Sequence, residues 1–318
     1  MIYLADYITQ MHCGYSKDYP GKVLESWYRM ILGNKGEAVM DTVVSGGLRL
    51  FLDSGAFSAW SKGIQINLQE YISFCKRYEA LLEVMAVLDV IPGGPGRSPT
   101  PEEIELAAQT SWDNYQTMLE AGLPKDKLLP CFHYGEDWRW LRKYMEVTDY
   151  VALGAMAKLK EDARTRWLDF AMRILCDEQG LPAIRFHGFG MTSFFLMRRY
   201  PWYSVDSTSW VLNSRFGTIY VPLYRNGRWI YSRDPWKVVV SDKSPKIKDA
   251  GVHFNTWPEP AQAVIREYVE SKGFTIEGAG KDYKVRDQLN IIYYKDFEKA
   301  LPKWPWAMDR ARQTGVFF

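Results

Sequence analysis

Short apolar segments alternate with segments of helical periodicity through most of the chain. The apolar segments predict strands, and the patterns between them, with apolar positions three to four residues apart, predict helices. Their strict alternation indicates right-handed crossovers and a parallel sheet. The predicted strands are residues 2–5, 48–52, 84–90, 128–133, 150–155, 183–189 and 203–205. The predicted helices are residues 67–83, 100–121, 137–146 and 160–179.

The number of strands favours a closed barrel. Seven are clear and an eighth is not assigned, so the expected α/β fold is a (β/α)8 TIM-like barrel rather than an open sheet. After residue 206 the pattern changes to a β-hairpin insertion over 218–231, with an Asn226-Gly227 turn, and a helix over 258–272. We expect a single domain over 1–318, with a barrel core of about 1–235 and a short C-terminal extension of about 236–318.

Acidic residues end three of the predicted strands. Asp53, Asp89 and Asp206 each follow a short apolar run. Taken singly, an aspartate at such a place more often caps the next helix or turn. In a barrel, however, the carboxyl ends of all strands converge on one mouth, where His133 and Gly154 would join these three residues. Paired carboxylates suit reactions at an anomeric carbon, because one can attack the sugar while the other moves the leaving group's proton.

The distribution of basic and aromatic residues suggests a nucleic-acid partner. The net charge of +2 and the charged fraction of 25% are ordinary for a globular protein. Between residues 198 and 248, however, ten Lys or Arg residues stand against three acids, with ten aromatic residues interleaved. Cations for phosphates beside flat rings for unpaired bases are typical of proteins that hold single-stranded or opened nucleic acid. A strand-rich segment whose aromatic residues fill a core fits this composition equally well.

The cysteines and histidines do not predict a metal site. Cys13, Cys75, Cys131 and Cys176 are widely scattered, and no Cys-x-x-Cys pair occurs. We therefore expect free thiols and no structural zinc. The N-terminus lacks the basic start and long apolar region of a signal peptide, and no apolar run is long enough to cross a bilayer. The expected location is the cytoplasm, without a membrane partner.

Several of these segments together resemble one enzyme family, the tRNA-guanine transglycosylases. The similar segments, in the family's order, are Asp53-Ser54-Gly55-Ala56-Phe57-Ser58, Ala86-Val87-Leu88-Asp89, Cys131-Phe132-His133-Tyr134-Gly135, Leu153-Gly154-Ala155-Met156-Ala157, His187-Gly188-Phe189-Gly190 and Ser204-Val205-Asp206-Ser207-Thr208. The resemblance covers residues of about 45–235. These barrel enzymes exchange a guanine base for a 7-deazaguanine.

Two departures from the family point to one branch of it. The chain lacks the cysteine-rich zinc subdomain and the extra RNA-binding domains of the tRNA enzymes. In both respects it resembles the phage DpdA-type 7-deazaguanine DNA transglycosylases. That resemblance implies DNA as partner and a 7-deazaguanine base, such as 7-cyano-7-deazaguanine, as small-molecule substrate. It also implies phage DNA modification that protects against restriction, in the cytoplasm of the host.

The resemblance also implies roles for individual residues. Asp206 would attack C1′ of a deoxyguanosine and hold the sugar covalently, and Asp53 would manage the proton on the departing and the incoming base. Asp89 would accept hydrogen bonds from the guanine edge. The further base-binding residues would be Ser54, Phe57 (by stacking), His133 and Gly154. The nearest basic residues, and so the candidates for phosphate contacts, are Lys158, Arg185, Arg198, Arg199 and Arg215. No metal or other cofactor is implied.

Other functions remain open at this point. The chain could be a transglycosylase that acts on tRNA, or a non-catalytic nucleic-acid-binding barrel within a larger enzyme. A carbohydrate-active barrel would also use paired carboxylates, but it does not explain the Asp53 and Asp89 motifs together. The sequence leaves open which deazaguanine is inserted, which DNA context is preferred, and whether the protein forms a homodimer.

Overall fold

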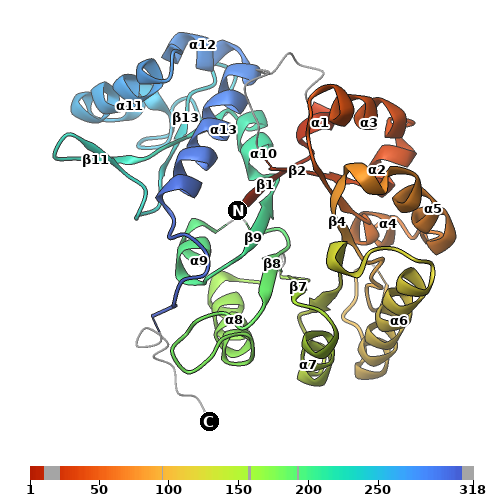
Figure 1. Ribbon diagram of the computed structural model, residues 1–318. Coiled ribbons are helices and arrows are strands. Elements are labelled where there is room, and N and C mark those ends of the chain that lie inside the picture. The colour runs from red at the N-terminus through yellow and green to blue at the C-terminus, as the bar shows by residue number, and fades with distance from the viewer. Residues whose placement is uncertain (11–21, 95, 157–158, 192, 310–318) are drawn as a thin grey trace.

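The computed structural model describes residues 1–10, 22–94, 96–156, 159–191 and 193–309. Its central feature is a nearly closed, barrel-shaped sheet of nine parallel strands in the order β5-β4-β3-β2-β1-β9-β8-β7-β6 (Figure 1). The fold is α/β and TIM-like, as the alternating pattern predicts. The strands are β1 (Ile2–Ala5), β2 (Lys22–Ser26), β3 (Leu50–Asp53), β4 (Leu82–Ala86), β5 (Leu128–Leu129), β6 (Cys131–His133), β7 (Tyr150–Gly154), β8 (Arg185–Gly188) and β9 (Ser204–Ser207).

The two ends of the sheet meet at Pro130. This residue alone separates β5, which pairs with β4, from β6, which pairs with β7. Proline has no N–H for the ladder, but its carbonyl accepts a hydrogen bond from Ala152 N at 2.8 Å. The predicted strand over 128–133 is thus divided in two. Counted as one interrupted strand, the two parts bring the barrel to eight.

Helices cover the outside of the sheet. The Thr100 side chain accepts from Glu103 N at 3.3 Å and the Glu103 carboxylate accepts from Thr100 N at 2.9 Å, which confirms the capping box predicted before the longest helix. The helices are α1 (Tyr7–Gln10), α2 (Trp27–Leu32), α3 (Gly36–Ser45), α4 (Ala56–Trp60), α5 (Leu68–Tyr78), α6 (Pro101–Glu120), α7 (Trp138–Val147), α8 (Glu161–Leu175), α9 (Phe194–Arg199) and α10 (Ser209–Arg215), with short 3-10 turns at Glu79–Leu81 and Lys125–Lys127.

Some predicted boundaries are wrong. The helix predicted over 67–83 ends at Tyr78, and a 3-10 turn leads from it into β4. That strand ends at Ala86 rather than near residue 90, so Asp89 lies beyond the strand and not at its last residue. The helix predicted over 160–179 ends at Leu175. The strand that the sequence left unassigned is β2, which pairs between β1 and β3.

Two layers of buried apolar side chains stabilise the barrel, one on each face of the sheet. The strands are buried on both faces, as expected for a parallel sheet covered by helices. The outer layer lies between strands and helices, and a smaller inner layer fills the barrel with residues such as Tyr3, Phe51, Leu129 and Tyr150. Among the residues described, no helix combines the length and the apolar character needed to cross a membrane.

A C-terminal lobe adjoins the barrel beside α10 (Figure 1). Its separate hydrophobic core already includes Ile219 and Val221, before residue 236. In the lobe, Asn290 is fully buried and bonds to the backbone of Trp210, Thr218 and Tyr220, which ties the lobe to the barrel. The elements are β10 (Thr218–Val221), β11 (Leu223–Arg225), β12 (Arg228–Ile230), β13 (Trp236–Val239), a 3-10 turn (Phe254–Thr256), α11 (Glu259–Ser271), α12 (Ile276–Lys281) and α13 (Tyr283–Ala300).

The predicted hairpin is shorter than expected. Only β11 and β12 pair across the Asn226-Gly227 turn, whose two residues have φ of 51° and 73°. Positive φ at both positions is what a two-residue hairpin turn requires. The residues of β10, which the sequence assigned to the same hairpin, pair instead with β13. Pro222 separates the two ladders.

Candidate active site

Polar side chains occupy the carboxyl end of nearly every barrel strand. The predicted aspartates Asp53 and Asp206 lie in β3 and β9, and Asp89 lies in the loop after β4. The structure brings these three together, since the charges of Asp89 and Asp206 both raise the pKa of Asp53. The other polar side chains of this ring are Asp6 after β1, His133 in β6 and His187 in β8, and the backbone of Gly154 in β7 lies among them.

Asp53 lies at the centre of this carboxylate group. Burial, followed by the charges of Asp89 and Asp206, raises the pKa of Asp53 from 3.8 to about 7, while a hydrogen bond from Gly55 N opposes the shift. Asp53 therefore exchanges a proton near neutral pH, as a general acid or base requires. The backbone turns away directly after it, because Gly55 has φ of 79°.

Ser54 connects this turn to Asp89. Its side chain is fully buried, donates to Asp89 Oδ1 at 3.4 Å and accepts from Ala56 N at 3.3 Å. Ser54 is therefore placed to hold Asp89, and its contact with the base edge stays a prediction. Phe57 follows on α4 with half of its surface exposed, and its ring centroid lies 5.7 Å from that of Trp60. An exposed ring beside the mouth suits stacking on a flat ligand.

His133 joins two carboxylates. Its Nε2 lies 2.7 Å from Asp89 Oδ2 and its Nδ1 lies 2.8 Å from Glu136 Oε1. Burial alone would lower the pKa of His133, but the neighbouring groups outweigh it and raise the pKa well above its ordinary value. Because burial raises the pKa of the adjacent Cys131 thiol to about 11, that thiol is neutral, and the two carboxylates hold the imidazolium.

Gly154 has a steric role here. A Cβ at this position would lie 2.6 Å from Cys131 Sγ and 3.1 Å from His133 Cδ2. Both of those side chains therefore point toward the Gly154 backbone across the ladder between β6 and β7. The Gly154 carbonyl accepts from Tyr134 N at 3.2 Å. Only glycine leaves the space that the Cys131 and His133 side chains occupy.

A chain of hydrogen bonds runs through the barrel interior to Asp206. Tyr150 Oη lies 2.6 Å from Ser204 Oγ, Ser204 Oγ lies 2.7 Å from His187 Nδ1, and His187 Nε2 lies 3.3 Å from Asp206 Oδ1. Burial lowers the pKa of His187, so its ring is neutral and carries one hydrogen. That hydrogen is on Nε2, because an unprotonated Nε2 would repel the Asp206 carboxylate. Gly190 N also donates to Asp206 Oδ1, at 2.8 Å.

Two acids were missed from the sequence, Asp6 at the mouth and Glu25 on the outer face of β2 beside α1. Asp6 follows the apolar run of β1 just as Asp53 follows that of β3, so the same pattern could have identified it. Burial raises its pKa, while an ion pair with Arg29 opposes the shift. Glu25 is fully buried in β2 and accepts from Thr9 Oγ1 at 2.9 Å. Burial and the charge of Asp6 raise the Glu25 pKa to about 7.

The predicted phosphate contacts do not gather at the mouth. Arg185 begins β8, at the opposite end of the barrel, and binds Asp149 at 2.8 Å. The other three arginines pair with acids elsewhere: Arg198 with Asp234, Arg199 with Asp169, and Arg215 with the buried Asp287 of α13. Lys158 lies outside the described residues. The basic side chains described beside the mouth include Arg29 and Lys62, whose Nζ lies 5.6 Å from the Tyr28 ring centroid.

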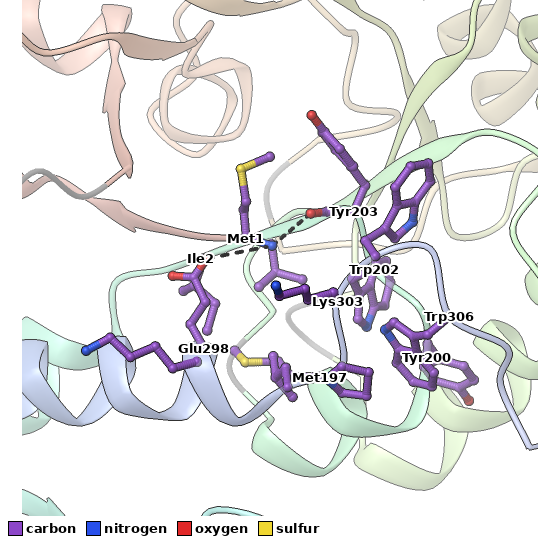
Figure 2. A pocket seen from close by; sticks show the side chains of 14 residues that line it. Met1, Ile2, Met197, Tyr200, Trp202, Tyr203, Glu298, Lys303 and Trp306 are labelled. Carbon is purple, nitrogen blue, oxygen red and sulfur yellow. Dashed lines mark hydrogen bonds and ion pairs between the residues drawn. The ribbon is translucent and has the colours of Figure 1, made fainter.

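A cavity of about 550 Å³ lies at the other end of the barrel (Figure 2). Met1 and Tyr203 line it at the starts of β1 and β9, and Trp304 and Trp306 of the C-terminal segment cover it. The Met1 amino group donates to Tyr203 O at 2.8 Å, and the rings of Tyr203 and Trp304 lie 5.1 Å apart. This cavity is separate from the carboxylates of the mouth.

The mouth thus combines a carboxyl group that titrates near neutral pH, a second carboxylate fixed by hydrogen bonds, and a third beside a protonated histidine. Such a set can protonate a leaving group, attack an electrophilic carbon and bind a ligand edge rich in N–H donors. Comparison with models of known families and with curated protein sequences finds no match to this chain.

Proposed function

We propose that the barrel mouth catalyses base exchange in DNA, replacing guanine by a 7-deazaguanine through a covalent link between Asp206 and deoxyribose. The observation that carries this proposal is the convergence of Asp53, Asp89 and Asp206 on one mouth, where Asp53 has a pKa of about 7. A nucleophile and a proton carrier are the two groups that this reaction needs.

The surroundings of Asp206 support its role as nucleophile. Both hydrogen bonds that the described residues give this carboxylate, from Gly190 N and His187 Nε2, end on Oδ1. Oδ2 is therefore available to a sugar carbon. Because the His187 ring is neutral, it orients the carboxylate without cancelling its negative charge.

The proposed reaction has two steps that balance. First, Asp206 Oδ2 bonds to C1′ while the bond from C1′ to the guanine nitrogen breaks; the electron pair moves onto guanine, and protonated Asp53 supplies a proton to it. Next, the Asp53 carboxylate removes the proton from the ring nitrogen of the incoming 7-deazaguanine. That nitrogen bonds to C1′ and the Asp206 carboxylate leaves. Asp53 ends protonated, as it began.

Base recognition would fall to Asp89 and Phe57. The Asp89 carboxylate, held by Ser54 and His133, would accept from the ring N–H and the exocyclic amine of guanine, and the exposed Phe57 ring would stack on the purine. The choice of DNA rests on the family resemblance. A guanine in duplex DNA would have to leave the stack to reach the mouth.

The test compares the wild type with Asp206→Asn, which keeps the size of the side chain and removes its nucleophilic charge. Labelled guanine exchanged into DNA and into tRNA is measured in parallel, and the covalent protein–DNA adduct is sought on denaturing gels. We expect Asp206→Asn to lose exchange into DNA by roughly 1000-fold or more, together with the adduct. Asp149→Asn, at an exposed ion pair with Arg185, is the matched control and should retain both.

Exchange that persists in Asp206→Asn would overturn the mechanism. Incorporation into tRNA alone would change the substrate assignment. Salt-dependent binding of DNA with no base release by the wild type would instead indicate a non-catalytic nucleic-acid-binding barrel.

A further inference from the structure

A cysteine, a histidine and an aspartate form a compact cluster on one side of the mouth. One potential ligand atom from each of Asp89, Cys131 and His133 lies within 4.8 Å of the other two. Cys131 and His133 are two residues apart on β6, so their side chains extend to the same face of the strand. Asp89 approaches them from the loop after β4, the strand that pairs with β5.

We propose that Asp89, Cys131 and His133 bind a divalent transition-metal ion, and that zinc is the ion their donor atoms suit best. A thiolate, an imidazole nitrogen and a carboxylate oxygen are the three ligand types that zinc takes in proteins. Three protein ligands would leave the fourth tetrahedral position to water or to a ligand that enters the mouth. This inference does not depend on the proposed base exchange.

The surroundings of His133 resemble those of a metal-bound histidine. Its Nδ1 lies 2.8 Å from Glu136 Oε1, so a carboxylate fixes the ring through the nitrogen that points away from Cys131 and Asp89. This is the outer-shell arrangement that orients metal-ligating histidines. Glu136 is itself buried, at 7% exposure, and within the described part of the chain its Oε2 has no hydrogen-bond partner.

The cluster can accept an ion with a small movement. His133 Nε2 and Asp89 Oδ2 lie 2.7 Å apart, whereas two such ligands of a tetrahedral zinc are about 3.4 Å apart. Asp89 can supply that shift, because it lies in a loop beyond the end of β4 and its side chain is 16% exposed. An ion would enter on this side, since Cys131 and His133 are almost fully buried. Binding would release to solvent the hydrogen between His133 and Asp89 and the thiol hydrogen of Cys131.

An ion at this position would bind an oxygen of the Asp89 carboxylate, to which we assign the guanine edge. The ion and a purine would therefore compete for Asp89. Metal binding is measurable with the protein alone, without DNA or base, so a failure of this inference is distinguishable from a failure of the proposed function.

The experiment titrates the full-length protein, freed of metal by a chelator, with Co²⁺ as a spectroscopic substitute for zinc. We expect a thiolate-to-cobalt charge-transfer band in the near ultraviolet and its loss on addition of Zn²⁺. Cys131→Ser should lack the band. Cys75→Ser removes a buried thiol on α5, away from the cluster, and should keep it. Glu136→Gln, which retains all three ligands, should weaken cobalt binding by about 10- to 100-fold.

Two results would overturn the proposal: a wild-type protein that shows no band, or a band of equal strength in Cys131→Ser. If Cys131→Ser does not fold, the affinity of Glu136→Gln decides, and wild-type cobalt affinity in that variant would contradict the site.

Discussion

The substitution Asp53→Asn should stabilise the protein at alkaline pH and also inactivate it. Asparagine has nearly the shape of aspartate and can still accept the hydrogen bond from Gly55 N, but it cannot ionise. In the wild type, burial and the charges of Asp89 and Asp206 raise the pKa of Asp53 from 3.8 to about 7. The folded protein therefore keeps this proton over a pH range in which the unfolded chain has released it.

The sign and size of the effect follow from that difference. Between pH 3.8 and about 7 the folded state binds more protons at Asp53 than the unfolded state, so the free energy of unfolding falls as the pH rises through this window. From pH 5 to pH 8 the loss due to Asp53 is about 2.5 kcal/mol. Asp53→Asn removes this loss. Relative to the wild type, the variant should thus gain about 2.5 kcal/mol between pH 5 and pH 8.

Urea unfolding of both proteins at the two pH values measures this quantity as a double difference, in which all other titrating groups cancel. Asp149→Asn, whose side chain is 70% exposed, is the matched control and should give a value near zero. Base exchange by Asp53→Asn should be lost at both pH values. A double difference near zero for Asp53→Asn would show that Asp53 titrates as an ordinary carboxyl group, and its role as proton carrier would then fall.

Three further predictions concern Glu25, Gly55 and Ser204. Glu25→Gln should gain stability over the wild type by about 2.5 kcal/mol from pH 5 to pH 8, for the same reason, and an unchanged pH dependence of urea unfolding would refute it. Gly55→Ala would place a Cβ 2.5 Å from two side-chain atoms at φ of 79°, and should cost roughly 2 kcal/mol or more. Gly63→Ala, at φ of 68° but with nothing within 4 Å, should cost about 1 kcal/mol; equal melting temperatures for the two variants would contradict the steric argument. Ser204→Ala frees the His187 hydrogen to move to Nδ1, so single-turnover base exchange should slow by about tenfold, and a wild-type rate would show that this hydrogen bond does not matter.

The alternation of apolar segments was sufficient to predict the barrel, but not all of its strands. The missed strand, β2, is five residues long and contains Lys22 and Glu25. Glu25 is fully buried because Thr9 and the start of α1 bind its carboxylate. An acid inside a short strand interrupts the apolar pattern, and the backbone groups that compensate for its burial cannot be recognised in the sequence.

Only the site residues that end an apolar strand could be predicted from the sequence, because the carboxyl ends of parallel strands meet at the mouth of a barrel. Asp53 and Asp206 were located in this way, because an acid that ends an apolar strand must lie at one end of the barrel. The arginines were predicted as phosphate contacts because they are close in sequence to the strand ends, but this closeness does not place them at the mouth. Arg185 is close to His187 in number, but each residue of a strand advances by about 3.3 Å, so Arg185 lies at the start of β8, away from the mouth. Its ion pair with Asp149 comes from another part of the chain, which a sequence pattern does not reveal.

The two histidines of the mouth differ in charge because their hydrogen-bond partners differ. His133 in β6 has a carboxylate at each ring nitrogen, so it is held as a cation and offsets the charge of Asp89 and Glu136. His187 in β8 has a carboxylate at one nitrogen and only the Ser204 hydroxyl at the other, and burial keeps it neutral. The half of the mouth that would bind the base is therefore partly neutralised. The half that holds Asp206 has no such cation at His187, and a carboxylate that is proposed to attack carbon needs its negative charge.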